Sequence, residues 1–240
     1  FQVYKTFIQG FPPIKGDKVT FIGSTFMKLG EKETYLNHCV ALGECGSVNN
    51  AVIESYSTEK EILLAWTELI QRENPDIVIG YNIFGFDFKF MVDRASELDC
   101  LDEFLQLSRN KNEICDIKKS SIHIASGVHE LQYISMPGRV LVDLYNYFRR
   151  EYNLPSYKLD NVASHFIGDF ISDFTYKDKV TIFTSKDLMG LTEGNYVRFE
   201  EIGHSTDIYA DGRKFMVTEV DSKGGTFKIK AKFRLNKKKK

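Results

Sequence analysis

Three polar side chains suited to catalysis or binding follow a short apolar run, residues 77–79. The run has no polar alternation, which is typical of a strand covered on both faces, and we expect this strand to be central in a sheet. Tyr81, Asn82 and Asp87 come after it, at a predicted junction between strand and helix where side chains can point into a cleft. Phenylalanines at every second position from 84 to 90 would lower the dielectric around Asp87. A carboxylate in the first turn of a helix is favoured by the helix dipole, so helix capping and metal ligation make similar demands on Asp87.

The spacing of these residues matches a known motif. Tyr81, Asn82, Phe86 and Asp87 resemble the second exonuclease motif of family B DNA polymerases, Tyr-Asn-x-x-x-Phe-Asp. The lead-in Pro-Asp-Ile-Val-Ile-Gly resembles the strand before that motif, especially in polymerases of large DNA viruses of eukaryotes. Two later runs, Gly-Arg-Val-Leu-Val-Asp-Leu and the one that begins Arg-Glu-Tyr-Asn-Leu-Pro, resemble the same family in the same order. The resemblance covers roughly residues 11–170. An alternative remains in which the aromatic residues belong to a core and Asp87 only caps the helix.

The resemblance implies a proofreading 3′→5′ exonuclease domain with an RNase H-like fold, a mixed α/β sheet with flanking helices. Such an enzyme hydrolyses the terminal phosphodiester of DNA with two divalent metal ions. Asp87 would then be one of several carboxylates that hold Mg²⁺ or Mn²⁺. Phe86 would stack on the last nucleotides of a frayed single strand, Asn82 would hydrogen-bond to them, and Tyr81 would pack beneath.

Other parts of the family pattern are missing. The first motif, Asp-x-Glu, does not occur before residue 74, and the third, Tyr-x-x-x-Asp, is absent because Tyr157 and Asp160 have the wrong spacing. A Phe-Pro stretch like residues 11–13 follows the first motif in the family, so we expect that pair just upstream of Phe1. The palm motifs of the polymerase are absent too. We therefore expect an interior slice of the parent polymerase that is inactive alone, since one carboxylate cannot hold two metal ions.

Asp143 is a second candidate carboxylate, at a predicted strand end. Capping of the helix that it opens is the favoured interpretation. The five histidines fall at no ligand spacing.

Composition sets broad limits on the class of protein. With 240 residues, 42% hydrophobic and 27% charged, the chain has the composition of a globular protein. It has no apolar run near the ~20 residues of a membrane span. Its four cysteines lack paired C-x-x-C spacing, which indicates free thiols in a reducing, intracellular compartment. For a viral polymerase that compartment would be the host nucleus or a cytoplasmic replication site.

Local patterns predict the elements around the motif. Thr58 and Glu61 form a capping box that opens a helix ending near Glu73. A second helix is predicted from about residue 86 to 96. The apolar runs 131–135 and 139–142 are predicted to form a hairpin.

The last part of the chain differs in character. Residues 170–188 are predicted to be a linker, and residues 191–233 contain three β runs typical of a small curled sheet or partial barrel. We therefore divide the chain into a partial exonuclease domain, residues 1–183, and a small basic β insertion, residues 184–240. Residues 213–240 hold eleven lysines and arginines against two acidic residues. This charge could contact a phosphate backbone or could be an ordinary solvated face.

The interpretation is therefore a fragment of a family B DNA-directed DNA polymerase that acts in viral DNA replication. Its expected partners are DNA, with a single-stranded 3′ end at the exonuclease cleft, and a processivity factor. Two alternatives are a non-catalytic nucleic-acid-binding module with a nuclease-like fold and an insertion that docks a protein.

Overall fold

The computed structural model describes residues 2–4, 16–31, 33–124, 127–188, 190–202 and 206–233. The chain divides into two compact units, Phe1–Leu159 and Asp160–Lys240. The Phe-Pro stretch at 11–13 and the terminal lysines lie outside the described residues.

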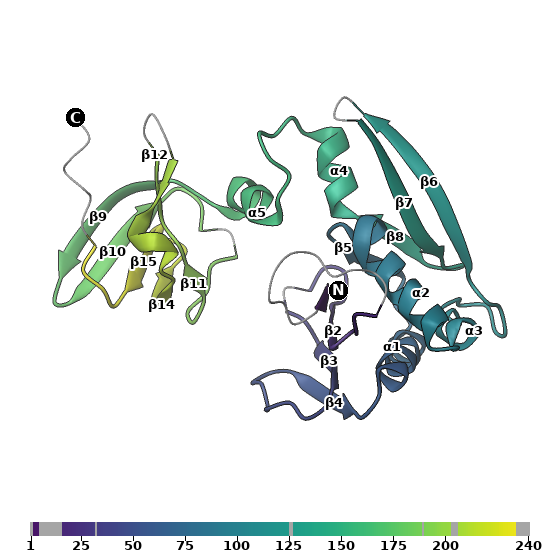
Figure 1. Cartoon of the computed structure of the whole chain (residues 1–240). Coiled ribbons are helices and arrows are strands. Elements are labelled where there is room, and N and C mark those ends of the chain that lie inside the picture. Colours follow the sequence, from purple (N-terminus) through teal and green to yellow (C-terminus); the bar gives the residue numbers. More distant parts are fainter. Residues whose placement is uncertain are drawn as a thin grey trace. The chain divides into compact units, whose positions relative to one another are not determined.

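A four-stranded sheet opens the first unit. Its order is β1 (Gln2–Tyr4), β2 (Phe21–Phe26), β3 (Leu36–Leu42) and β4 (Val52–Tyr56). Strand β2 is antiparallel to both of its neighbours, β1 and β3, and β4 is parallel to β3. The sheet is therefore mixed, as expected; Figure 1 labels β2, β3 and β4 next to one another.

Helix α1 (Glu59–Glu73) carries the chain from this sheet to the next strand. The predicted capping box is confirmed: Thr58 accepts a hydrogen bond from the Glu61 N–H, and the Glu61 side chain accepts one from the Thr58 N–H. The helix ends at Asn74, which is left-handed (φ 47°). The chain then enters β5 (Ile77–Gly80), which pairs in parallel with β8 (Val140–Asp143).

Two predictions about β5 are wrong. Among the described residues it pairs with β8 alone, so it is not central in a sheet, and its exposure shows that it is not covered on both faces. Val78 faces the core and is 6% exposed, whereas Ile77 and Ile79 on the other face are 50% and 47% exposed. Val140, the pairing partner of Ile77, is likewise exposed. The apolar run therefore forms a ribbon with one buried face.

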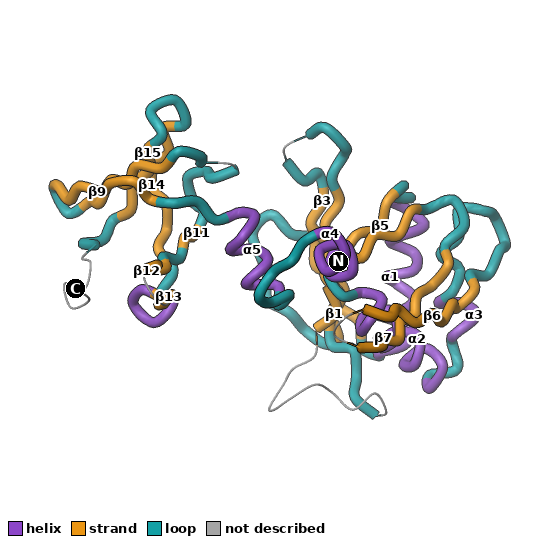
Figure 2. The backbone as a smooth tube through the Cα atoms, turned by 90° about the horizontal axis from the view of Figure 1, so that it is seen from above, coloured by secondary structure: helices purple, strands orange, loops and turns teal. Residues whose placement is uncertain are grey.

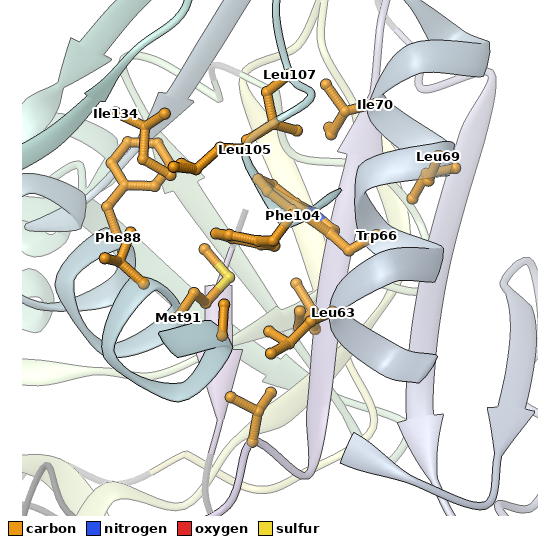
Figure 3. Close-up of a cluster of buried hydrophobic side chains, with 14 of the residues drawn as sticks. Leu63, Trp66, Leu69, Ile70, Phe88, Met91, Phe104, Leu105, Leu107 and Ile134 are labelled. Carbon is orange, nitrogen blue, oxygen red and sulfur yellow. The ribbon is translucent and has the colours of Figure 1, made fainter. Parts of the chain in front are cut away.

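The core of the first unit lies between α1 and the helices that follow β5. These are the π-helix η1 (Ile83–Asp87), α2 (Phe88–Glu97) and α3 (Leu101–Phe104). Figure 3 shows Leu63 and Trp66 of α1 and Met91 of α2 pointing toward Phe104. Trp66 stacks on Phe104 with ring centroids 6.0 Å apart, and both side chains are fully buried.

A long hairpin, β6 (Asp116–Ile124) and β7 (Gly127–Ser135), lies beside η1 and α2 (Figure 1). The predicted hairpin between residues 131–135 and 139–142 is therefore wrong. The two strands β6 and β7 are separated by only two residues and pair directly, while the unalternating apolar run of β8 pairs with β5. After β8 come α4 (Leu144–Glu151) and α5 (Leu159–Ile167).

The second unit is built mainly from strands (Figure 2). Its five-stranded sheet has the order β11, β14, β15, β10, β9, and β12 and β13 form a separate pair. The bounds are β9 (Ile171–Lys177), β10 (Val180–Ser185), β11 (Tyr196–Val197), β12 (Glu200–Ile202), β13 (Thr206–Ile208), β14 (Phe215–Asp221) and β15 (Thr226–Ile229), with a short helical turn η2 (Tyr209–Gly212) before β14. Its core consists of the buried side chains of Phe183, Phe199, Val217, Phe227, Ile229 and Phe233.

The three predicted β runs fall on strands of this unit, but the predicted linker over residues 170–188 is wrong, because those residues contain β9 and β10. The predicted domain boundary after residue 183 falls inside β10, whereas the compact units meet at residues 159 and 160. Strand β9 lies at the edge of the sheet and exposes most of its side chains, so its sequence lacks the apolar alternation of a half-buried strand.

A buried ion pair joins α1 to α2. Arg94 donates from Nε and Nη2 to the two carboxylate oxygens of Glu59 at 2.7 and 2.8 Å, and both residues are 5% exposed. Glu59 also accepts the Val19 N–H, and Arg94 also donates to Glu97. The hydrogen bonds to Glu59 raise the pKa of Arg94 above its usual value, so the guanidinium is charged throughout the accessible pH range.

We expect Arg94→Leu to lower the free energy of unfolding of the first unit by about 3 kcal/mol, because it leaves Glu59 charged and buried without its partner. The measurement is urea unfolding followed by the fluorescence of Trp66, the single tryptophan. Lys89→Leu is the matched control on the same helix, since its pair with Asp93 is partly exposed and is worth about 1 kcal/mol or less. An equal loss of unfolding free energy in the two variants would contradict the prediction that the buried pair of Glu59 and Arg94 matters more to stability than the partly exposed pair of Lys89 and Asp93.

Candidate functional site

The predicted site residues lie where β5 ends and the helical segment begins. Asn82 has a left-handed backbone (φ 61°), and the chain then makes a π turn, in which the Phe88 N–H donates to the Ile83 carbonyl. The carbonyl of Asn82 accepts from the N–H groups of Gly85 and Phe86 at 3.1 and 3.0 Å. Single π turns are rare and frequently occur at functional sites.

Asp87 is the last residue of this π turn, one residue before α2 begins. It is 6% exposed and has right-handed helical backbone angles. The sequence predicted Asp87 in the first turn of a helix that begins near residue 86. The structure instead places a full turn, Ile83–Asp87, before α2. Asp87 stands at the N-cap position of α2, and its side chain makes no capping hydrogen bond there.

The other three predicted residues surround the same turn and are each half-buried. Phe86 stacks nearly parallel on Phe90, with ring centroids 5.5 Å apart. Tyr81 donates its hydroxyl to the Tyr157 carbonyl at 2.5 Å and packs edge-on against Tyr145. Tyr81 thereby ties the turn to the segment after α4.

Asp143 has a larger part in this arrangement than the sequence indicated. The predicted cap is confirmed, because its Oδ1 accepts the Tyr145 N–H at the start of α4 at 3.0 Å. Its carboxylate also accepts the N–H groups of Asn82 and Phe84, at 2.8 and 3.1 Å, and the side-chain amide of Asn146 at 2.9 Å. Asp143 pairs with Gly80 in the parallel ladder and is 4% exposed. The sequence did not reveal the contacts to the turn, because they depend on a strand pairing that it did not predict.

The hairpin also contacts the turn. Phe84 lies 5.0 Å from Tyr133 of β7 and 6.1 Å from Phe88 of α2, centroid to centroid. Aromatic packing therefore holds the turn against β7 and α2.

The two-metal site expected from the resemblance is not assembled by the described residues. They contain no group of three or more His, Cys, Asp or Glu side chains that could hold a metal ion. Both oxygens of Asp143 accept N–H groups, and its carboxylate thereby contacts the start of the π turn and the start of α4. Of the two candidate carboxylates at this sheet edge, Asp87 is the one that does not cap a helix.

Comparison with known proteins identifies the family. Residues 1–162 match DNA polymerase family B, exonuclease domain, and the chain belongs to this family. It is 39% identical over 260 residues to the DNA polymerase of Phaeocystis pouchetii virus, an alignment that covers 100% of this chain and 25% of that protein. It is 36% identical over 214 residues to the DNA polymerase of Pyramimonas orientalis virus, covering 88% of this chain and 17% of that protein.

A cellular relative matches a shorter part of the chain. The DNA polymerase delta catalytic subunit of Arabidopsis thaliana is 34% identical over 160 residues, which is 66% of this chain and 14% of that protein. The chain thus spans a quarter or less of the length of these relatives. The family match ends at residue 162, close to the end of the first compact unit. Among the described residues, no helix is long and apolar enough to cross a membrane.

Because Gly85 has no side chain, the side chain of Asn82 can lie next to its backbone. A Cβ at this position would overlap the side-chain amide oxygen of Asn82, and that amide is the end of a flexible side chain, which can move. We expect Gly85→Ala to fold with a stability change of about 1 kcal/mol or less, since alanine favours a helical turn, but to rotate Asn82. The shift of the Asn82 side-chain amide resonances in an NMR spectrum checks this.

Gly46→Ala is the control, because a Cβ there meets no atom within 4 Å. Unchanged Asn82 resonances in Gly85→Ala would show that the turn has room for a methyl group.

Proposed function

We propose that residues 1–159 form the larger part of an RNase H-like, proofreading 3′→5′ exonuclease domain within a DNA-directed DNA polymerase. The observation that carries the proposal is the placement of the Tyr81 to Asp87 motif at the end of the parallel pair β5–β8, with Asp87 buried and not used as a helix cap. The mixed sheet and the α1 crossover support the fold assignment.

In this proposal each motif residue has a distinct role at the 3′ end of a single strand. Asn82 hydrogen-bonds to the terminal nucleotides, and Phe86 offers them a ring that is already held flat by Phe90. Tyr81 anchors the turn through Tyr157. Asp87 contributes one carboxylate to a site for Mg²⁺ or Mn²⁺. The described residues do not complete the ligand set of two ions, so further carboxylates are required for hydrolysis.

We further propose that the second unit is a β module inserted in this domain. Support comes from its separate core and from the family match, which ends at residue 162. The partners proposed for the whole polymerase are DNA and a processivity factor. For its location we propose a reducing compartment, either the host nucleus or a cytoplasmic site of viral replication; the four free cysteines of this chain support this proposal. The alternative of a non-catalytic nucleic-acid-binding module is not favoured by the exonuclease-family match.

We expect Asp87→Ala, in the polymerase that contains this chain, to reduce 3′→5′ excision at least about 100-fold while nucleotide incorporation stays largely intact. Removal of a metal-binding carboxylate affects the exonuclease site alone. The measurement is degradation of a 5′-labelled single strand, with primer extension assayed in parallel.

Asp93→Ala is the matched control, because Asp93 lies on α2, is partly exposed and pairs with Lys89. It should excise normally. Normal excision by Asp87→Ala would refute the assigned role of Asp87.

A further inference from the structure

The carboxylate of Asp143 joins two helical segments that start at the same sheet edge. On one side it accepts the Tyr145 N–H and the Asn146 side-chain amide at the start of α4. On the other it accepts the N–H groups of Asn82 and Phe84, where the π turn starts. Each carboxylate oxygen accepts one hydrogen bond from each segment. Oδ1 accepts the N–H groups of Asn82 and Tyr145, and Oδ2 accepts the Phe84 N–H and the side-chain amide of Asn146.

These bonds act on a segment whose conformation is costly to hold. A left-handed non-glycine residue and a π turn are both disfavoured relative to a regular α-helix, and they persist only where the surroundings fix them. The first N–H groups of a helical segment have no partner within it and carry partial positive charge. A buried carboxylate that accepts such groups forms short, charge-assisted hydrogen bonds, which are about twice as strong as neutral ones.

We infer that Asp143 is a positioning residue of the exonuclease site. It holds Asn82 in its left-handed conformation and fixes the start of the π turn, and this sets where Phe86 and Asp87 lie at the turn's other end. It acts through the backbone of the turn. The inference rests on the proposed function of the motif, and it adds a residue that the motif itself does not contain.

A substitution can separate this role from helix capping. Serine at position 143 keeps a good N-cap for α4, since its hydroxyl can accept the Tyr145 N–H. Its single, shorter oxygen cannot also hold both Asn82 and Phe84. Asparagine at 143 keeps the shape and one acceptor oxygen, so it should hold part of the turn. Asn146→Ala removes one of the four donors and leaves all three backbone bonds in place.

The test uses the whole polymerase and two readouts. The first is excision of a single-stranded primer. The second is capture of the 3′ end without hydrolysis, in EDTA, reported by the fluorescence of 2-aminopurine at the primer terminus, which rises when the base leaves its neighbour and enters a site. We expect excision to fall at least about 10-fold in Asp143→Ser, to be intermediate in Asp143→Asn and to be near normal in Asn146→Ala. The 2-aminopurine signal should fall in the same order, with primer extension unchanged.

Wild-type excision and 2-aminopurine signals in Asp143→Ser would overturn the inference. So would a parallel loss of primer extension and thermal stability in Asp143→Asn, because that would show a general structural role. If Asp143→Ser does not fold, the comparison of Asp143→Asn with Asn146→Ala decides the question. The proposed function is judged separately: normal excision by Asp87→Ala refutes it whatever the Asp143 variants do.

Discussion

The parallel pairing of β5 with β8 is the constraint on which the site depends. Because both strands end at the same edge, Gly80 and Asp143 lie opposite each other, and the segments that follow them start side by side. The N–H groups at the start of each segment need acceptors, and one buried carboxylate serves both. The geometry of the motif is therefore a consequence of strand register.

The buried ion pair extends this dependence to the rest of the first unit. Asp87 ends the π turn directly before α2, so any shift of α2 would move the carboxylate. Arg94 on α2 is held by Glu59 at the start of α1, and the stacked rings of Trp66 and Phe104 fill the space between helices. Close packing transmits small displacements, so this core indirectly fixes the position of Asp87.

How far the sequence predicted the structure follows from the range of the interactions involved. The capping box of Thr58 and Glu61 and the cap at Asp143 were predicted correctly, since each requires only residues within three positions. The position of the motif after β5 was also predicted, because an apolar run followed by polar residues is a local pattern. The pairing of β8 with β5 joins residues about sixty positions apart and was assigned to the wrong neighbour. The contacts of Asp143 to the turn could not be predicted for the same reason. The π turn is local in sequence, but it is disfavoured relative to an α-helix and persists only where its surroundings fix it, so the local pattern did not predict it.

The basic run of the second unit has an acidic and an aromatic neighbour within that unit. The excess of lysine and arginine over residues 213–240 left two interpretations open, a contact with a phosphate backbone and an ordinary solvated face. Lys228 of β15 lies 2.7 Å from Glu219 of β14, and Lys232, which follows β15, lies over the ring of Tyr176 of β9. Glu219 and Lys228 are register partners in the β14–β15 ladder, so strand pairing brings this acidic residue next to a lysine.

The second unit has a core of its own, built around Phe183, which stacks on Phe199 and Phe227. A segment that buries its own apolar surface can be inserted in a domain without contributing to that domain's core. This agrees with a family match that ends at residue 162, near the point where the first compact unit ends.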